Sequence, residues 1–239
     1  AIALTAALSC AGAQSREGTL TFTPHAPVAR VQAGLQPLGL GAERDGFLFV
    51  PRGNDARHPQ PLLILLHGAT QRARLFERMT SAADSVGVVI LAPDSREVTW
   101  DAIRGRFGVD VAFLQRAIGR AFDRAFVDPC RVVIGGFSDG ATYGLSLGIR
   151  NARGLRGVVA FSPGFLIPAR EPQQLPVFIR HATEDAILPI DRTSRRILAV
   201  LRDAGFSVDY EEFSGPHTIR AADALAALRW VTQRSCGRG

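Results

Sequence analysis

Uninterrupted apolar runs alternate with amphipathic stretches along most of the chain. Residues 62–66 read Leu-Leu-Ile-Leu-Leu, and residues 88–92 read Val-Val-Ile-Leu-Ala. Runs without a polar position are typical of strands that are covered on both faces, as in a parallel sheet. Further short apolar or alternating runs predict strands over residues 47–50, 131–135, 158–161, 177–179 and 208–213.

Helical spacing of apolar residues fills the intervals between these strands. Asp110 is expected to cap a helix whose apolar residues recur three or four positions apart: Val111, Phe113, Leu114, Ile118, Phe122 and Phe126. Other helices are expected up to about residue 86, up to about residue 149, over residues 191–204 before Gly205, and over residues 220–235. Strands and helices in alternation predict an α/β fold with a mostly parallel central sheet and helices on both faces.

The length of 239 residues suits one α/β domain. We expect the catalytic domain to occupy residues 46–239. Residues 14–45 have weak periodicity and several Gly and Pro, so they are predicted to be a linker that contributes an edge strand. Residues 1–13 are predicted to be the remnant of a signal peptide.

The N-terminal residues resemble the end of an export signal. A short apolar run leads to Ala11-Gly12-Ala13, which fits a signal-peptidase site before Gln14. Leu8-Ser9-Cys10 partly matches a lipoprotein box, with Ala7 where Leu is expected, so simple export is favoured over a lipid anchor at Cys10. The run is too short to span a bilayer, and no stable membrane insertion is expected. The predicted location is therefore periplasmic or extracellular.

The formal net charge is +6, and every basic residue is Arg because the chain contains no Lys. The arginines are spread along the chain, and no aromatic-and-basic recognition motif accompanies them. The densest group, Arg192, Arg195 and Arg196, is interpreted as a solvated helix face. No nucleic-acid partner is therefore expected.

Two cysteines lie in the predicted domain. Cys130 precedes a predicted strand and Cys236 follows the last predicted helix. An oxidising compartment favours pairing them, and such a disulfide would tie the C-terminus to the base of the sheet. Cys and His do not occur at metal-ligand spacing, so no metal site is predicted.

The strongest local signal is Gly136-Phe137-Ser138-Asp139-Gly140, a G-x-S-x-G sequence between a predicted strand and a predicted helix. This setting is typical of the nucleophile elbow, whose sharp turn exposes the serine. The glycines allow neighbouring backbones to approach. The helix N-terminus offers donors to developing negative charge. We interpret Ser138 as a nucleophile.

A serine nucleophile needs a base, and only two histidines follow Ser138. The chain order of this fold is nucleophile, acid, histidine, and only His217 leaves room for an acid before it. His217 is therefore the predicted base. His67 and His181, each at the end of a strand, are expected to stabilise loops.

Asp185 is the predicted acid, because it follows the strand over residues 177–179 and precedes His217. Glu184 and Asp191 are the alternatives, interpreted as a solvated loop residue and a helix N-cap. The oxyanion hole is assigned to the backbone N–H groups of Asp139 and Ala69, with Thr70 as the second choice for the latter.

Together these motifs resemble the bacterial phospholipase/carboxylesterase group of α/β-hydrolases, close to esterases related to dienelactone hydrolase and polyhydroxybutyrate depolymerase. The matching stretches are LLHGATQ, LAPDSREVTWD, VDPCRVVIGGFSDGATYGLSLG, FSPGF, HATEDAILPIDRTSRRI and GPHT. The resemblance runs from about residue 47 to the C-terminus. It implies an α/β-hydrolase fold, activity on carboxylic esters, no cofactor, and a triad of Ser138, Asp185 and His217. A small ester substrate is expected because the sequence has no long insertion that could form a large lid. Ala182 and Ala186 depart from the family, which often has Gly and Pro there.

Phe137, Trp100 and Leu188 are the candidate substrate-binding residues. Trp100 follows the second core strand, at the sheet edge where substrate loops gather, and Phe137 and Leu188 are apolar residues that could line or support an acyl pocket. A polyester depolymerase or a peptidase of the same fold is the alternative function. A non-catalytic binding protein on this scaffold is disfavoured because all three triad residues are present.

Overall fold

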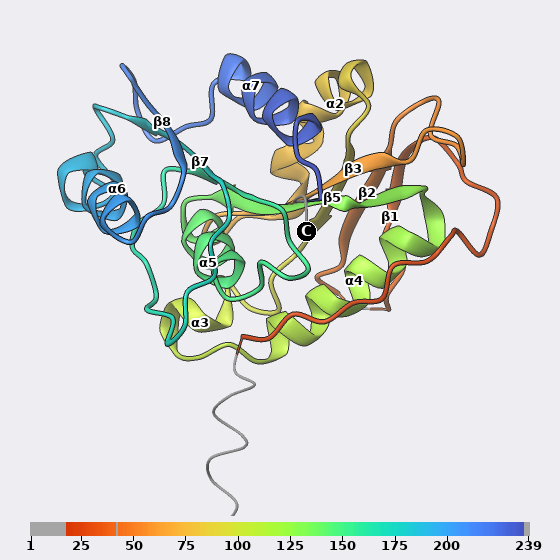
Figure 1. Ribbon diagram of the computed structural model, residues 1–239, viewed down its shortest axis with the longest axis horizontal. Coiled ribbons are helices and arrows are strands. Elements are labelled where there is room, and N and C mark those ends of the chain that lie inside the picture. Colours follow the sequence, from red (N-terminus) through yellow and green to blue (C-terminus); the bar gives the residue numbers. More distant parts are fainter. Residues whose placement is uncertain (1–17, 42, 237–239) are drawn as a thin grey trace, which may run out of the picture.

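The computed structural model describes residues 18–41 and 43–236, and its centre is a sheet of eight strands (Figure 1). Across the sheet the order is β1-β2-β4-β3-β5-β6-β7-β8. β2 runs antiparallel to both of its neighbours, and every pair from β4 to β8 is parallel. The predicted α/β fold with a mostly parallel sheet is therefore confirmed. The strands are β1 (Gly34–Pro37), β2 (Gly46–Val50), β3 (Gln60–Leu66), β4 (Val89–Pro93), β5 (Val127–Phe137), β6 (Val158–Phe161), β7 (Val177–Ala182) and β8 (Val208–Phe213).

Helices cover both faces of the sheet, as Figure 1 shows. One face carries the 3-10 helix η1 (Ala73–Met79), α2 (Thr80–Val86) and α7 (Ala221–Thr232). The other face carries α3 (Asp101–Arg104), α4 (Val109–Arg124), α5 (Asp139–Gly148) and α6 (Ser194–Asp203), with the short 3-10 helix η2 (Ile190–Arg192) before α6. The helix that was expected up to residue 86 is thus split into a 3-10 part and an α part.

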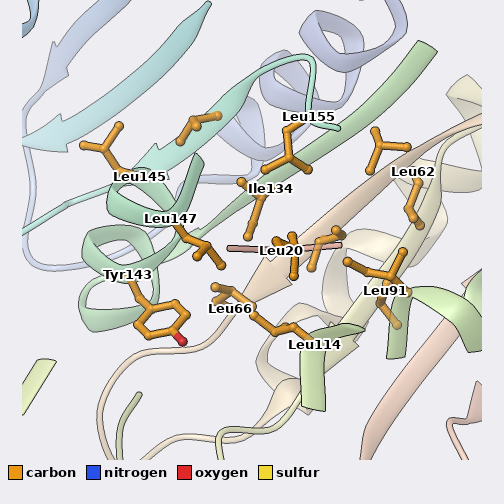
Figure 2. Close-up of a cluster of buried hydrophobic side chains, with 14 of the residues drawn as sticks. Leu20, Leu62, Leu66, Leu91, Leu114, Ile134, Tyr143, Leu145, Leu147 and Leu155 are labelled. Atoms are coloured by element: carbon orange, nitrogen blue, oxygen red, sulfur yellow. The ribbon is translucent and has the colours of Figure 1, made fainter. Parts of the chain in front are cut away.

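The side chains of β3 are buried on both faces of the sheet. Leu62, Ile64 and Leu66 pack in the cluster beneath α4 and α5, whereas Leu63 and Leu65 pack in the cluster beneath α2 and α7. Figure 2 shows the first of these clusters, with Leu62 and Leu66 among its residues. A strand covered on both faces has no polar position, which explains the unbroken apolar run in the sequence.

The described part of residues 14–45 packs against the rest of the chain. β1 pairs with β2 as the expected edge strand, and Leu20 and Leu38 are buried in the core. The Leu20 N–H donates to Asn151 Oδ1 at 2.8 Å, which fixes the start of the segment beside the end of α5. The predicted signal-peptide remnant and Cys10 lie outside the described residues.

The start of α4 corrects one prediction. Asp110 does not cap this helix, because the helix begins at Val109 and Asp110 lies in its first turn. The capping carboxylate belongs to Asp101, whose Oδ2 accepts the N–H groups of Gly108 at 2.8 Å and Asp110 at 3.0 Å. The Asp110 carboxylate instead accepts the N–H groups of Arg96 and Asp101, both at 2.7 Å. The sequence could not reveal that Asp101 and not Asp110 caps the helix, because the hydrogen bonds of the two carboxylates join separate segments of the chain.

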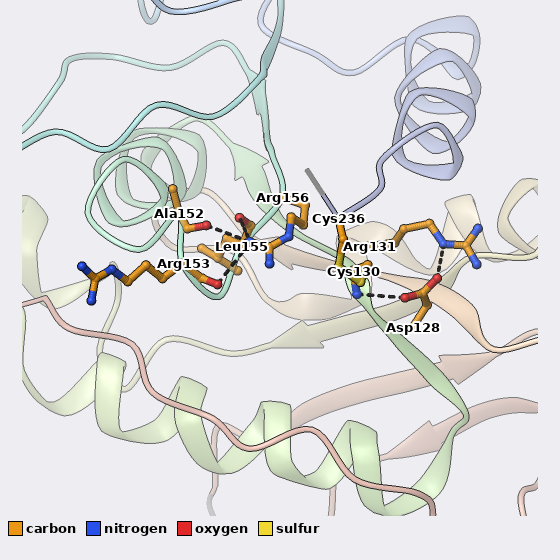
Figure 3. The surroundings of a disulfide bond; sticks show 8 residues. All are labelled: Asp128, Cys130, Arg131, Ala152, Arg153, Leu155, Arg156 and Cys236. Atoms are coloured by element: carbon orange, nitrogen blue, oxygen red, sulfur yellow. Dashed lines mark hydrogen bonds and ion pairs between the residues drawn. A yellow bond between two sulfur atoms is a disulfide. The ribbon is translucent and has the colours of Figure 1, made fainter. Parts of the chain in front are cut away.

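A disulfide joins Cys130 to Cys236 (Figure 3), with the two Cα atoms 4.6 Å apart. Cys130 lies near the start of β5, and Cys236 follows α7. The Cys130 N–H donates to Asp128 Oδ1 at 2.8 Å, so the backbone at the bridge is also held locally. The two cysteines are 106 positions apart in the sequence, and the loop that the bond closes contains Ser138, Asp185 and His217.

Loss of this disulfide is expected to destabilise the protein. The double variant Cys130→Ser/Cys236→Ser should lose about 2 to 5 kcal/mol of unfolding free energy, because a cross-link over a long loop restricts the unfolded chain. Urea unfolding of the variant and of the oxidised wild type measures the loss, and reduced wild type is the control. Alkylation of both cysteines in denatured, unreduced wild type would show that the bridge does not form.

Candidate active site

Ser138 occupies the sharp turn between β5 and α5. Its backbone has φ 57° and ψ −121°, a conformation that a residue with a Cβ rarely adopts. The Ser138 N–H donates to the Phe161 carbonyl at 2.9 Å, so the last hydrogen bond between β5 and β6 fixes the turn. The side chain therefore stands at the carboxyl edge of the sheet, where open α/β sheets bind their ligands.

Gly136 and Gly140 are required by the packing around this turn. A Cβ on Gly136 would lie 2.3 Å from the Leu66 carbonyl oxygen, and one on Gly140 would lie 1.9 Å from the same oxygen. Both glycines therefore let the turn press against the end of β3. This contact also brings the loop after β3 to the nucleophile, since a Cβ on Gly68 would lie 3.2 Å from Ser138 Cβ.

His217 and Asp185 meet beside the elbow. His217 Nδ1 and Asp185 Oδ2 are 2.5 Å apart, although 32 residues separate them in the sequence. The His217 ring lies on the ring of Phe137, the residue before Ser138, with the centroids 4.5 Å apart. Among the described residues the Ser138 hydroxyl forms no hydrogen bond to His217. Such catalytic contacts often tighten only when substrate binds.

Asp185 is buried and ionised. Burial by itself raises the pKa of a carboxyl group, but here it is outweighed by the hydrogen bonds from the Leu188 N–H and from His217, and the pKa of Asp185 lies below its ordinary value. Asp185 Oδ1 accepts the N–H groups of Ile187 at 3.0 Å and Leu188 at 2.8 Å. These bonds leave Oδ2 directed at His217.

Asp185 Oδ2 also faces a second histidine, His181, at 3.0 Å from Nε2. The same nitrogen is 2.9 Å from the Leu188 carbonyl oxygen, which can only accept, so Nε2 carries the proton. Nδ1 then accepts the Ser194 hydroxyl. Burial lowers the pKa of His181 more than the nearby Asp185 raises it, which favours the neutral ring. The sequence suggested only a loop role for His181 and did not indicate Ser194.

The two alternative acids lie apart from His217. Glu184 is exposed and accepts the Ser214 hydroxyl at 2.5 Å. Asp191 is exposed and pairs with Arg195 at 2.6 Å. The structure therefore places Asp185 alone of these three carboxylates against His217.

The loop after β3 presents Ala69 to the site. The Thr70 N–H donates to the Val98 carbonyl at 2.7 Å and is not free for an oxyanion. Ala69 is exposed, and its N–H donates to no other group in the described part of the chain. The geometry therefore favours Ala69 over Thr70, and the other expected donor is the Asp139 N–H at the start of α5.

Buried residues hold this loop in place. The Ser95 N–H donates to His67 Nε2 at 3.0 Å, so His67 Nδ1 carries the proton that bonds the Gly68 carbonyl at 2.7 Å. Burial lowers the pKa of His67, consistent with this neutral form. Thr99 donates its hydroxyl to Asp139 Oδ2 at 2.7 Å and so links the neighbouring loop to the elbow.

Trp100 does not reach the substrate side of this loop. The prediction that Trp100 contacts substrate is wrong, because its side chain is completely buried. Its Nε1–H donates to the His67 carbonyl at 2.8 Å, which anchors the loop that carries Ala69 from behind. Trp100 follows β4 as expected, but the chain turns it into the core against Tyr143.

Phe137 and Leu188, the other predicted substrate-binding residues, each contact one of the predicted triad residues. Phe137 is 5% exposed and supports the His217 ring. Leu188 is half-buried, and its side chain would contact a Cβ on Gly164 at 3.5 Å. Leu188 is thus held against Asp185, whereas Phe137 packs on the His217 ring.

Residues 108–222 match the model of a protein family that is described as Phospholipase/Carboxylesterase. Acyl-protein thioesterase 1 of Gibberella zeae is 28% identical over 112 residues. That match covers 43% of this chain and about half, 47%, of the length of the curated relative. The matched family range contains the positions of Ser138, Asp185 and His217.

Solved structures show the same fold. A fluorophosphonate-binding serine hydrolase of Staphylococcus aureus superposes with a TM-score of 0.65 at 12% identity, covering 80% of this chain and 92% of that one. A carboxylesterase of Bacillus cereus superposes with a TM-score of 0.58 at 22% identity, covering 77% and 92%. Over residues 108–222 the chain is similar to the phospholipase/carboxylesterase family, and its fold is that of the α/β-hydrolases. The family resemblance and the α/β-hydrolase fold that the motifs indicated are confirmed.

Over residues 18–41 and 43–236, no three or more His, Cys, Asp or Glu side chains are grouped so that they could hold a metal ion. Within the same residues, none of the helices has the length and hydrophobicity needed to cross a bilayer.

His181 is expected to hold Asp185 in the orientation that His217 needs. His181→Asn should lower kcat by about tenfold to a hundredfold and leave KM within about twofold, because a carboxylate free to rotate misplaces the base. Ester hydrolysis across pH 5 to 9 measures both constants. Ser194→Ala, which removes only the bond to Nδ1, is the milder control. An unchanged kcat in folded His181→Asn would contradict this role.

Asp110 is expected to make the stability of the protein depend on pH. Burial raises the pKa of Asp110 to about 6, although the bonds from Arg96 and Asp101 oppose the rise. The folded protein therefore holds this proton more tightly than the unfolded chain, and the contribution of Asp110 falls as the pH rises from about 4 to 6.

The variant Asp110→Asn lacks this titration. The unfolding free energy of wild type relative to Asp110→Asn should therefore be about 2 to 3 kcal/mol greater at pH 4 than at pH 7. Urea unfolding of both proteins at the two pH values measures the difference. A difference that stays constant with pH would show that Asp110 titrates normally.

Proposed function

We propose that this serine hydrolase cleaves carboxylic esters through an acyl-enzyme, with Ser138 as nucleophile, His217 as base and Asp185 as the acid that orients His217. One observation carries the proposal. The 2.5 Å contact between Asp185 and His217 lies beside a serine that is held in a strained turn at the carboxyl edge of the sheet. A buried acid, a histidine and an adjacent serine form the arrangement that activates a hydroxyl group.

In the acylation step, Ser138 Oγ attacks the ester carbonyl carbon and its proton passes to His217 Nε2. Asp185 accepts the Nδ1–H of His217, which keeps Nε2 as the free base and then stabilises the imidazolium. The carbonyl oxygen becomes an oxyanion within reach of the N–H groups of Ala69 and Asp139. Fixed donors of this kind stabilise the charge without reorganising during the reaction.

The intermediate collapses when His217 gives its proton to the leaving alcohol oxygen, and the acyl group stays on Ser138. Water then takes the place of the alcohol: His217 removes a proton from it, the resulting hydroxide attacks the acyl carbon, and Ser138 leaves with that proton. The products are a carboxylic acid and an alcohol. Every proton transfer passes through His217, so its ring must stay aligned over Phe137 throughout the cycle.

Small esters are the proposed substrates. Leu188 is a half-buried apolar side chain beside Gly164, and both residues follow strands that end at the site. Leu188 is therefore proposed to contact the acyl group. The Leu188 N–H bonds Asp185, so the residue that would contact the acyl group is also fixed to the acid.

Thioesters are a second candidate substrate class. The curated relative at 28% identity is named an acyl-protein thioesterase. The same nucleophile, base and oxyanion donors would serve a thioester, because the acyl carbon is attacked in the same way and only the leaving group differs. Parallel rates on an ester and its thioester analogue decide between the two classes.

The location of this hydrolase is proposed to be periplasmic or extracellular. The disulfide between Cys130 and Cys236 supports export, since disulfides persist mainly in oxidising compartments. The N-terminal export signal that the sequence suggests is consistent with the same destination. Fractionation of the cells that make the protein tests the proposal.

Removal of the nucleophile should abolish hydrolysis. Ser138→Ala is expected to lower kcat on p-nitrophenyl acetate, butyrate and octanoate by about 10⁶-fold, because the triad acts as a unit. The three esters also rank the acyl lengths that the wild type accepts. Steady-state release of p-nitrophenol measures the rates.

Ser162→Ala is a matched control for this experiment. Ser162 is also a buried serine with positive φ, 51°, and it follows the neighbouring strand β6. This variant should retain wild-type activity. Equal rates for Ser138→Ala and wild type would mean that Ser138 is not the nucleophile.

A further inference from the structure

A cavity of about 480 Å³ lies between α6 and the segment over residues 164–172. We call it the α6 groove. Its lining is almost entirely apolar, with two arginines among the lining residues, and its size is typical of a site for a small organic ligand. The residues that line the groove are Ile149, Gly164, Phe165, Leu166, Pro168, Ala169, Pro172, Arg192, Thr193, Arg196, Ile197, Val200, Leu201, Ala204 and Phe206.

The wall of the groove opposite α6 is fixed by hydrogen bonds. The Gly164 N–H donates to Thr142 Oγ1 at 2.8 Å, and the Ile167 N–H donates to Ser146 Oγ at 3.0 Å. Gln174 Nε2 donates to the Ala204 carbonyl at 2.7 Å and ties the far end of the segment to the end of α6. The cavity is therefore preformed, which lowers the cost of ordering a ligand in it.

Apolar side chains along the groove are open to solvent. Phe165 is 45% exposed and Val200 is 54% exposed, on opposite walls. Each exposes apolar surface that an apolar ligand would cover. Ile197, Leu201 and Phe206 form a buried floor between them.

The two arginines of the groove differ from the neighbouring Arg195 in their ion pairing. Arg192 and Arg196 are four residues apart and exposed, and among the described residues neither has a carboxylate within ion-pair distance. Arg195 pairs with both Asp191 and Glu212, each at 2.6 Å. The groove therefore combines an apolar trough with two cations that have no acidic partner, which complements an anionic amphiphile.

We propose that the α6 groove binds a long-chain carboxylate, with the hydrocarbon chain in the trough and the carboxylate on Arg192 and Arg196. This site is separate from the proposed triad, because Ser138, Asp185 and His217 are not among the residues that line the groove. One lining residue of the groove nevertheless contacts the loop that follows Asp185. Thr193 lines the groove and donates its hydroxyl to the carbonyls of Leu188 at 3.3 Å and Pro189 at 3.0 Å.

Binding is tested with three amphiphiles that share one chain: dodecanoate, dodecanol and dodecyltrimethylammonium. Isothermal titration calorimetry with Ser138→Ala protein separates this test from catalysis, because the result does not depend on turnover. Dodecanoate should bind with a 1:1 stoichiometry, dodecanol about tenfold more weakly, and the cation more weakly still. Equal binding of all three would overturn the role of the arginines.

Variants locate the site. Arg192→Gln and Arg196→Gln should each weaken dodecanoate binding about fivefold and leave dodecanol unchanged. Arg195→Gln, on the same helix as Arg196 but with its charge already paired, is the matched control and should leave dodecanoate binding within about twofold. Val200→Glu should abolish binding of both ligands. Dodecanoate binding that survives Val200→Glu, or no binding to Ser138→Ala protein at all, would overturn the proposal.

Discussion

The close approach of the end of β3 to the turn between β5 and α5 is the constraint on which the site depends. The Leu66 carbonyl oxygen occupies the space that a Cβ on Gly136 or Gly140 would need. That contact holds Ser138 in its strained conformation and, because the chain after Leu66 continues into Gly68 and Ala69, it also places the proposed oxyanion donor beside the nucleophile. One backbone contact thus positions both the proposed nucleophile and the proposed oxyanion donor.

The electrostatic part of the site is built around Asp185 in a similar way. An ionised carboxylate in a buried position needs several donors, and here they come from the Ile187 and Leu188 backbone and from two histidines. The two histidines that contact Asp185 have different roles. The tautomer of His181 is set by the Leu188 carbonyl and Ser194, so it supports Asp185 as a neutral donor, while His217 stays half-buried and open to the proposed proton transfers.

Most of the fold could be predicted from the sequence because its strands are buried on both faces, which removes polar residues from 62–66 and 88–92 and makes the runs unmistakable. The elbow was equally visible, since its glycines are required by local contacts. The roles of Trp100 and Asp110 could not be predicted, because they depend on contacts with residues that are distant in the sequence. Their positions in the chain are near the site, but their side chains turn inward to partners about 10 to 40 residues away, Asp101, Tyr143 and the His67 carbonyl. The α6 groove was hidden for the same reason, because its walls come from separate segments that show no common pattern in the sequence.

The distribution of stabilising contacts across the sheet follows from these demands. The disulfide and its local hydrogen bonds lie at the start of β5, whereas the strained serine and its loops lie at the end of the same strand. Strain at Ser138 raises the free energy of the folded state, and a cross-link placed at the opposite end of the strand can offset that cost without touching a reacting group. The loop after β3 has no such covalent support. It depends instead on buried groups, the His67 ring and the Trp100 indole, whose polar atoms are each satisfied by the backbone they hold. Rigid support from behind leaves the exposed side of Ala69 free for an oxyanion, which is the condition that preorganised stabilisation of a transition state requires.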